Sequence, residues 1–459
     1  MRGTALVTAL LLAAGTGSWS AQPAAPPRRP LNVVLLIIDD ARWDSLGAAG
    51  NRVVRTPRID QLAKEGVRFE QARVTTPICM VSRATLLTGQ YMSRHGITEF
   101  GRAIAPGSFA NTFPGLLRRA GYWTGYVGKY GVGQPRQDDF DFLRAYEGRH
   151  WMTGSTGERV HVTERNVRDA IAFLQARPKE RAFALTVGFF APHAEDAAPE
   201  QYLPQEWSAR FYEGVRIPPP LRGDPAYLAA LPPFLSNDAN EGRVRYHWRF
   251  DTPDRYQAFM TRYYRLITEV DDAVGRIVDE LRAQGAYDDT LLIFIGDNGY
   301  FQADRGLADK WYPYEESQRV PLVVRDPRLA PERRGLTRDE FALNLDVAPT
   351  IVAAAGLPVP VVMQGQDLGP LYLSARAPAW REEFFHEHPT VTSRDRIPSS
   401  QGVIRGDWKY IEWPEFDYTQ LFDLKNDPGE IRNLAGQPAH ASRQERMRQQ
   451  LDAWRRRAR

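Results

Sequence analysis

Two continuous apolar runs dominate the hydrophobic pattern of the chain, and each ends abruptly in acidic or amide side chains. Residues 31–38 lead directly into Asp39–Asp40, and residues 290–295 lead through a glycine into Asp297–Asn298. Branched aliphatic runs without polar alternation are typical of strands buried on both faces, as in parallel sheets. Because ligands bind at the carboxyl ends of such strands, we expect these polar side chains to meet at one edge of a sheet.

Helical and extended patterns alternate between and around these two runs. A long amphipathic helix is predicted over 263–283, where apolar side chains recur at helical spacing before a glycine at 285. Alternation of this kind predicts an α/β fold, with a large, mainly parallel sheet flanked by helices. The other expected elements are helices over 59–65, 112–120 and 160–175 and strands over 122–127 and 183–190.

Two segments depart from this alternation. Residues 195–260 are rich in Pro, Tyr and Trp and have weak periodicity, so we expect a long insertion over one end of the sheet that shapes a substrate site. Past residue 356 the pattern changes to short strands and a charged helix from about 438. A main domain over 31–356 and a smaller C-terminal α+β domain over 357–459, with a short antiparallel sheet, are therefore expected. The short strands are predicted over 402–405, 408–412 and 421–424.

The N-terminus has the pattern of an export signal. Met1–Arg2 precedes the apolar run 5–14, which is followed by the small residues Ser18 and Ser20. We expect a signal peptide over 1–20, a Pro-rich linker over 21–30, and a periplasmic or secreted protein with no membrane span after cleavage, since the run is too short to cross a bilayer. The 459 residues carry a net charge of only +3, which gives no indication of a nucleic-acid partner.

Cys79 is the only cysteine of the chain, so it cannot form an internal disulfide. It opens a segment that ends at Gly89, a natural helix C-cap, and Arg83 follows it by one helical turn. Cys79 is thus expected at a helix N-terminus, where backbone N–H groups and the Arg83 guanidinium favour a sulfate or phosphate group. Taken alone, a single cysteine is more often a small buried apolar residue than a nucleophile.

The two strand-end clusters offer only oxygen ligands. Asp39, Asp40, Asp297 and Asn298 form the kind of set that hard cations prefer, which predicts calcium first and magnesium second. An Asp–Asp pair by itself is more often the cap of a following helix. The second cluster changes this interpretation, because two caps have no need to pool their oxygens at one sheet edge.

The segment beginning at Cys79 resembles the signature of the sulfatases, members of the alkaline phosphatase superfamily in which a cysteine is oxidised to Cα-formylglycine. The resemblance covers nearly the whole chain and implies an alkaline-phosphatase-like fold. It is carried, in order, by residues 31–40 and 79–89, Gly128-Lys129, Ala191-Pro192-His193, 296–299, Asp309-Lys310, 314–317, 345–350, Trp408-Lys409-Tyr410, 421–424, Asp427-Pro428 and Glu430.

The resemblance implies a sulfuric ester hydrolase that acts after a formylglycine-generating enzyme has converted Cys79. Export and the aromatic residues of the insertion favour sulfated carbohydrate as the substrate, with aryl sulfates also turned over. These aromatic residues would suit stacking on sugar rings or packing within the insertion itself, and they include Trp207, Tyr212, Tyr227 and Trp248. A hydroxyl of the hydrated aldehyde, held against Ca²⁺, would attack the sulfur, and the second hydroxyl would expel sulfate. The implied catalytic residues are Cys79, Arg83, Lys129, His193 and Lys310. The implied metal ligands are Asp39, Asp40, Cys79, Asp297 and Asn298, and the implied substrate contacts are Lys129, His193, Lys310 and Arg305.

Three positions depart from the family pattern. Val81 stands where proline or alanine is usual, and Gly131 stands where many members carry a histidine, which His150 or His161 would have to replace. Arg305 stands where relatives often have histidine, and is expected to contact an anionic substrate. These departures leave two alternatives open: a phosphonate or phosphate ester hydrolase on the same fold, and a catalytically weak protein that binds sulfated glycans.

Overall fold

The computed structural model describes residues 30–154 and 156–459. The signal peptide predicted over 1–20 and nearly all of the predicted linker lie outside these residues. Among the helices in the described part of the chain, none combines the length and apolar character needed to cross a membrane.

A large sheet of eight strands forms the centre of the fold. Only β12 runs antiparallel to its neighbours β9 and β2, so the sheet is mainly parallel, as predicted. From one edge to the other, its strands are β13 (Leu336–Arg338), β2 (Val67–Phe69), β12 (Leu322–Arg325), β9 (Thr290–Gly296), β1 (Asn32–Ile38), β8 (Phe183–Gly188), β4 (Trp123–Gly128) and β5 (Phe142–Ala145).

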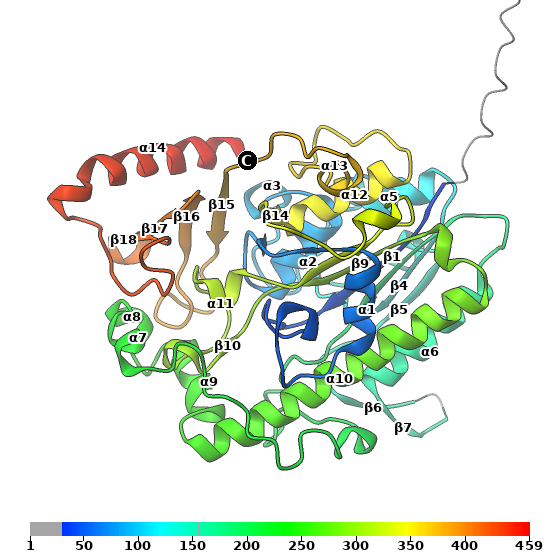
Figure 1. Cartoon of the computed structure of the whole chain (residues 1–459), viewed down its shortest axis with the longest axis horizontal. Helices are drawn as coiled ribbons and strands as arrows, with labels where there is room; N and C mark the ends of the chain where they lie inside the picture. The colour runs from blue at the N-terminus through cyan, green and yellow to red at the C-terminus, as the bar shows by residue number, and fades with distance from the viewer. Residues whose placement is uncertain (1–29, 155) are drawn as a thin grey trace, which may run out of the picture.

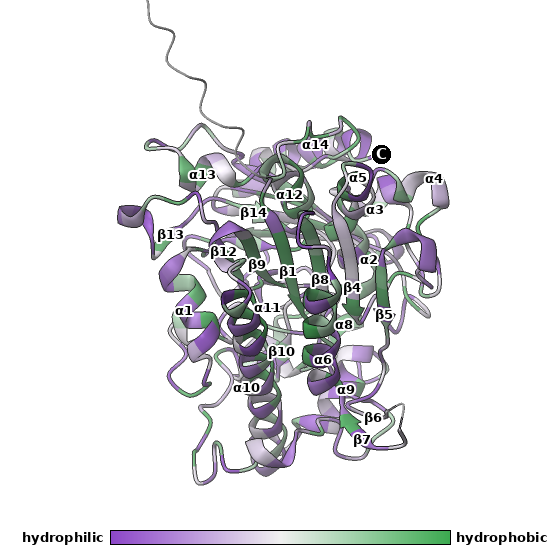
Figure 2. Ribbon diagram, turned by 90° about the vertical axis from the view of Figure 1, so that its right-hand side faces the viewer, coloured by the Kyte–Doolittle hydropathy of each residue, from purple (hydrophilic) through white to green (hydrophobic). Residues whose placement is uncertain are grey.

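Helices cover both faces of this sheet (Figure 1). Side chains of β1 alternate between two hydrophobic cores: Val34 and Leu36 face one, and Val33 and Leu35 face the other. This arrangement explains why residues 33–38 of β1 are all apolar. One core includes side chains of α1 (Pro57–Glu65), α6 (Val162–Ala176) and α10 (Pro253–Ala283), and the other includes those of α2 (Cys79–Thr88), α5 (Phe113–Arg119), α12 (Val347–Ala354) and α13 (Gly369–Leu373). Figure 2 shows the apolar strands in the centre, behind helices with polar outer sides.

The predicted insertion is more regular than its sequence indicates. It contains α7 (Pro225–Ala229), α8 (Pro233–Ser236) and α9 (Glu241–Arg249). The long helix α10 begins at Pro253, ten residues before the predicted start, because the Thr252 hydroxyl accepts a hydrogen bond from the Arg255 N–H and caps it. The long helix therefore takes in the last residues of the predicted insertion, and its predicted start at 263 was too late.

A second, smaller sheet follows the main one and is antiparallel throughout, as predicted for the C-terminal part. It consists of β15 (Glu383–His388), β16 (Ser400–Arg405), β17 (Trp408–Trp413) and β18 (Tyr418–Asp423), and it carries α14 (Ala441–Arg457) through the buried Met447 and Leu451. Figure 1 shows it on the left, beside the large sheet.

Candidate active site

The register of the large sheet brings its polar strand ends together. Ile38 of β1 pairs with Gly296 of β9, so Asp39–Asp40 and Asp297–Asn298 leave neighbouring parallel strands at the same level. On the other side of β1, Gly128 of β4 pairs with Gly188 of β8. Lys129 and the loop that carries His193 therefore start from the same edge. The expectation that Asp39–Asp40 and Asp297–Asn298 meet at one edge is confirmed.

Helix α2 points its N-terminus at this edge. Cys79 is its first residue, and every residue of the helix is buried. Gly89 ends the helix in the left-handed conformation, with φ +66°. Arg83, one turn after Cys79, donates from Nε to Asp297 at 2.7 Å and from Nη1 to the Lys129 carbonyl at 2.5 Å. Arg83 thus ties the Cys79 helix to two of the strand ends.

Each acidic group at the edge has a cationic partner. Lys129 Nζ pairs with Asp39, and Lys310 Nζ lies 2.5 Å from Asp40. His193 Nε2 lies 3.7 Å from the other oxygen of Asp40, while its Nδ1 lies 2.7 Å from the Ala194 carbonyl. Since a carbonyl oxygen can only accept, Nδ1 carries the proton in this contact. Nε2 is then the ring nitrogen that faces the acidic groups.

The oxygens at this edge fit a hard cation. Asp39 Oδ1, Asp40 Oδ2 and Asn298 Oδ1 are buried and have no hydrogen-bond partner among the described residues. Such buried acceptors are costly to leave unpaired, and a bound ion would satisfy all three. One ligand atom each of Asp39, Asp40 and His193 also lies within 4.8 Å of the others. Asp297 is differently placed, because its Oδ2 accepts from Arg83.

The pKa values of the buried groups at this edge shift in different directions, because burial and neighbouring charges act on each group to a different extent. Burial raises the pKa of Asp40 to about 7, because burial together with the charges of Asp39, Asp309 and Asp297 outweighs the opposing effect of Lys310. Burial also acts to raise the pKa of Asp39, but Lys129, His193 and Arg83 hold it below its ordinary value. Burial lowers the pKa of His193, and Lys310 and Lys129 lower it further, so that imidazole is neutral at pH 7.

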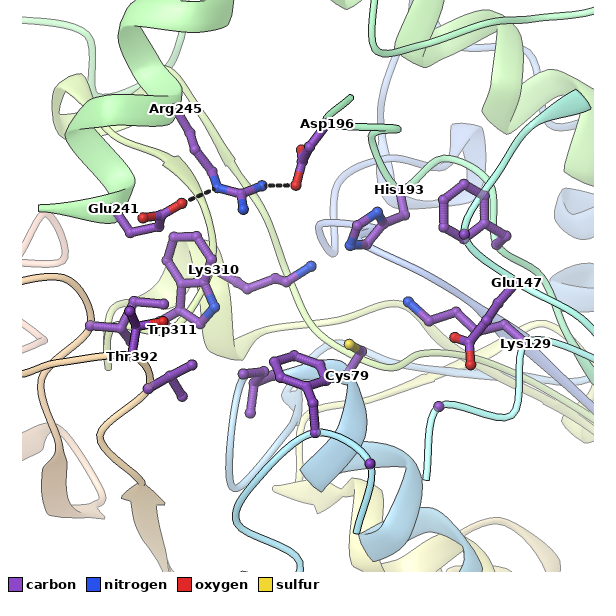
Figure 3. Close-up of a pocket in the computed structure, with 18 of the residues that line it drawn as sticks. Cys79, Lys129, Glu147, His193, Asp196, Glu241, Arg245, Lys310, Trp311 and Thr392 are labelled. Carbon is purple, nitrogen blue, oxygen red and sulfur yellow. Dashed lines mark hydrogen bonds and ion pairs between the residues drawn. The ribbon is translucent and has the colours of Figure 1, made fainter. Parts of the chain in front are cut away.

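A cavity of about 600 Å³ opens above Cys79 (Figure 3). Lys129, His193 and Lys310 line it together with Cys79, so the structure brings these predicted residues to one space. Figure 3 shows the two lysines and His193 converging on the region around the sulfur atom. Buried cations beside the N-terminus of a helix make this end of the cavity suited to a tetrahedral anion such as sulfate.

Comparisons with known proteins give this arrangement a family. The family model described as "Sulfatase" matches residues 31–357, and that described as "N-sulphoglucosamine sulphohydrolase, C-terminal" matches residues 303–457. The chain belongs to the sulfatase family. It is therefore a sulfuric ester hydrolase of the alkaline-phosphatase-like fold.

Relatives and solved structures are similar over almost the whole length of this sulfatase. N-acetylglucosamine-6-O-sulfatase of Bacteroides thetaiotaomicron is 26% identical, over 93% of this chain and 86% of its own. Human N-sulphoglucosamine sulphohydrolase is 28% identical, over 93% of this chain and 90% of its own. The crystal structure of the phosphonate monoester hydrolase of Agrobacterium radiobacter has the same fold, with a TM-score of 0.79, 23% identity and coverage of 94% and 96%.

Arg305 is the predicted site residue that the structure places elsewhere. Its side chain is fully buried, with Nε 3.1 Å from Glu316 and Nη2 3.3 Å from Glu430, and it does not line the cavity. The expectation that Arg305 contacts the substrate of this sulfatase was therefore wrong. Its partners lie 11 and 125 residues away in the sequence, so the role of Arg305 as a link to the C-terminal part could not be read locally.

Gly131 lines the cavity, and its geometry explains why this sulfatase has no side chain there. Its φ is +72°, and a Cβ atom at this position would lie 2.9 Å from Cδ of Arg83. Neither proposed substitute for the absent histidine lines the cavity. His150 and His161 are buried and stacked on each other, with ring centroids 5.7 Å apart.

The insertion, which was expected to shape a substrate site, and the C-terminal part line the cavity with residues that the sequence did not single out. Arg245 and Glu241 come from α9, while Thr392 and Arg396 come from the connection between β15 and β16. The aromatic residues expected to suit stacking on sugar rings do not line the cavity, and each contacts an aromatic or arginine side chain of the protein instead. They are Trp207, Tyr212, Tyr227 and Trp248.

Proposed function

We propose that this sulfatase releases sulfate from sulfated carbohydrate, using Cys79 after its conversion to formylglycine and a Ca²⁺ ion held by Asp39, Asp40, Asp297 and Asn298. The observation that supports this most directly is the arrangement of side chains at the carboxyl ends of β1 and β9. Three unpaired buried oxygens lie beside the N-terminus of the Cys79 helix, in one space with Lys129, His193 and Lys310. Bound calcium would supply Lewis-acid activation of the nucleophile and of a sulfate oxygen.

The other site residues position the Cys79 helix, bind the sulfate group and assist the leaving alcohol. Arg83 is fixed by Asp297 and by two backbone carbonyls, of Lys129 and Phe189, and so holds the Cys79 helix against the metal ligands. Lys129 and Lys310 supply positive charge for the three outer sulfate oxygens. His193 is neutral and presents an unprotonated Nε2 to the cavity, so it can accept a proton there but cannot donate one. Lys310 is therefore the group placed to donate to the oxygen of the leaving alcohol.

The choice of carbohydrate rests on the relatives, two of which are named for sulfated glucosamine derivatives. The phosphonate monoester hydrolase is similar in fold alone, so a phosphonate or phosphate ester remains the alternative substrate. We further propose export to the periplasm or the medium, with a formylglycine-generating enzyme as the partner during maturation.

The test is release of sulfate from 6-sulfated N-acetylglucosamine and from 4-nitrophenyl sulfate, beside release from a phenyl phosphonate ester. The protein would be purified from a host that installs formylglycine, and Asp39→Asn and Asp297→Asn would be compared with wild type. Asp271→Asn is the control, since Asp271 is a buried acid that accepts from the Ile59 N–H at the start of α1. Sulfate release that only the first two variants lose supports the proposal, and faster phosphonate hydrolysis would contradict it.

A further inference from the structure

The outer part of the Cys79 cavity carries charges that are separate from the metal-site pairs. These charges belong to the walls formed by the insertion, by the segment after β5, and by the connection between β15 and β16. They face whatever part of the substrate lies beyond the scissile sulfate. The residues are Glu147, Asp196, Glu241, Arg245 and Arg396.

Arg245 reaches the cavity with its guanidinium held on two sides. Nε donates to Glu241 at 2.7 Å, and Nη1 lies 2.5 Å from Asp196 and 3.0 Å from Asp309. Figure 3 shows the third nitrogen without a dashed line, on the side of Lys310. A guanidinium fixed in this way loses little conformational entropy when it donates to a ligand, which makes Arg245 a pre-formed hydrogen-bond donor in the cavity wall.

The carboxylates around Arg245 are balanced by an equal number of cations. Arg249 pairs with Asp309 at 2.9 Å and with Asp196 at 2.7 Å, and Arg396 pairs with Glu241 at 2.5 Å. Three arginines therefore face three carboxylates in this cluster. A second anionic group on the substrate would find no net positive charge here, and could pair with Arg245 only in competition with these carboxylates.

Glu147 gives the outer part of the cavity a net negative charge. It lines the cavity, its side chain is exposed, and no ion pair to it is found in the described part of the chain. Figure 3 shows it on the opposite side of Cys79 from Arg245. Its charge repels sulfate or carboxylate groups placed beyond the reacting one, and leaves hydroxyl, amide and ammonium groups unopposed.

We propose that this cavity selects a sugar that carries one sulfate group and no other anionic group, with Arg245 donating a hydrogen bond to an uncharged oxygen of that sugar. The inference rests on the proposed function, because it takes the sulfate to be bound beside Cys79. Trp311, whose ring lies 5.6 Å from the Arg245 guanidinium, lines the same wall and offers an apolar face to the sugar.

The test compares N-acetylglucosamine 6-sulfate with glucosamine 2-N,6-O-disulfate, which differ only in the group on nitrogen: an uncharged acetyl in the first and an anionic sulfo group in the second. The value of kcat/KM would be measured on the calcium-loaded protein, and the calorimetric Kd on its Cys79→Ala variant, which lacks the nucleophile and so does not consume the sugar. Wild type is expected to have the higher kcat/KM, and Cys79→Ala the lower Kd, for the monosulfate. With Glu147→Gln in either background, the ratio of the values for the two sugars should be about three- to tenfold smaller, which is the range expected for a partly screened pair of charges. Glu200→Gln, which removes an exposed insertion carboxylate outside the cavity, should leave the preference unaltered.

Arg245→Met is expected to raise KM for the monosulfate about tenfold or more, with a smaller effect on kcat, because the lost hydrogen bond concerns binding. An equal or stronger response to the disulfate, in kcat/KM and in Kd, would overturn the selectivity. A preference that Glu147→Gln leaves intact would overturn the role of Glu147. Absence of sulfate release from both sugars would contradict the proposed function, while their Kd values would still decide the selectivity.

Discussion

Replacing Gly131 by alanine is expected to disturb the active site through Arg83. Gly131 lies at φ +72°, and a Cβ would meet Cδ of Arg83 at 2.9 Å, which is shorter than side chains tolerate. Arg83 cannot yield freely, because Asp297 and the Lys129 carbonyl hold its guanidinium. The substitution must therefore shift a buried ion pair.

The magnitude has two parts. Alanine in the left-handed region costs about 1–2 kcal/mol. Breaking a buried ion pair costs about 3–5 kcal/mol, so a partial displacement of Arg83 from Asp297 adds roughly 1–3 kcal/mol. Since a misplacement of about 1 Å at a catalytic group can reduce the rate about a hundredfold, kcat should fall between ten- and a hundredfold.

A matched control exists elsewhere in the chain. Gly96 has nearly the same φ, +70°, but open space where a Cβ would stand, so Gly96→Ala carries only the backbone cost. Urea-induced unfolding and sulfate release would be measured for both variants. Gly131→Ala should be the less stable by roughly 1–3 kcal/mol and the less active. Equal stability and equal activity of the two variants would refute the steric reasoning, and with it the explanation for the missing histidine.

Buried charges and the metal site give three further predictions. Arg249→Met should lower kcat, because Arg249 pairs with Asp309, which has a φ of +66° and directly precedes Lys310. Steady-state kinetics would measure the loss, and an unchanged kcat would contradict the positioning role of Arg249. Burial raises the pKa of Glu269 from 4.5 to about 7, so the folded state favours the protonated carboxyl and the free energy of unfolding falls as pH rises from 4.5 to 7. Glu269→Gln should therefore be more stable than wild type by roughly 3 kcal/mol at pH 8, measured by urea titration. A variant whose stability follows the same pH profile as wild type would contradict this effect of Glu269. Chelation should abolish sulfate release and lower the unfolding midpoint, calcium restoring both better than magnesium; full activity in chelator would exclude the metal role.

The parts of the fold that the sequence predicts well are the strands whose side chains are buried in apolar surroundings on both faces. The runs at β1 and β9 are buried on both faces, so their apolar composition alone indicates parallel strands. Since parallel strands end at one edge, the sequence pattern by itself places Asp39–Asp40 beside Asp297–Asn298. The start of α10 is also encoded locally, by Thr252 followed by proline, but the weak periodicity of the surrounding insertion hides it.

The parts that the sequence did not reveal depend on contacts between distant segments. Arg305 is buried by Glu316 and Glu430, and nothing near it in the chain indicates that it is not exposed. Arg245 lies in a helix whose role depends on Asp309, 64 residues away. The steric constraint at Gly131 likewise depends on Arg83, which only the packing of α2 against the sheet edge brings close.

The most direct test of the account is the chemical state of Cys79 in the active protein. The peptide that contains Cys79 would be identified by mass spectrometry in protein purified from native cells, and sulfate release from a sulfated sugar would be measured on the same sample. We predict the mass of formylglycine, in a fraction that rises and falls with the rate of sulfate release. An unmodified cysteine in a fully active sample would contradict the account.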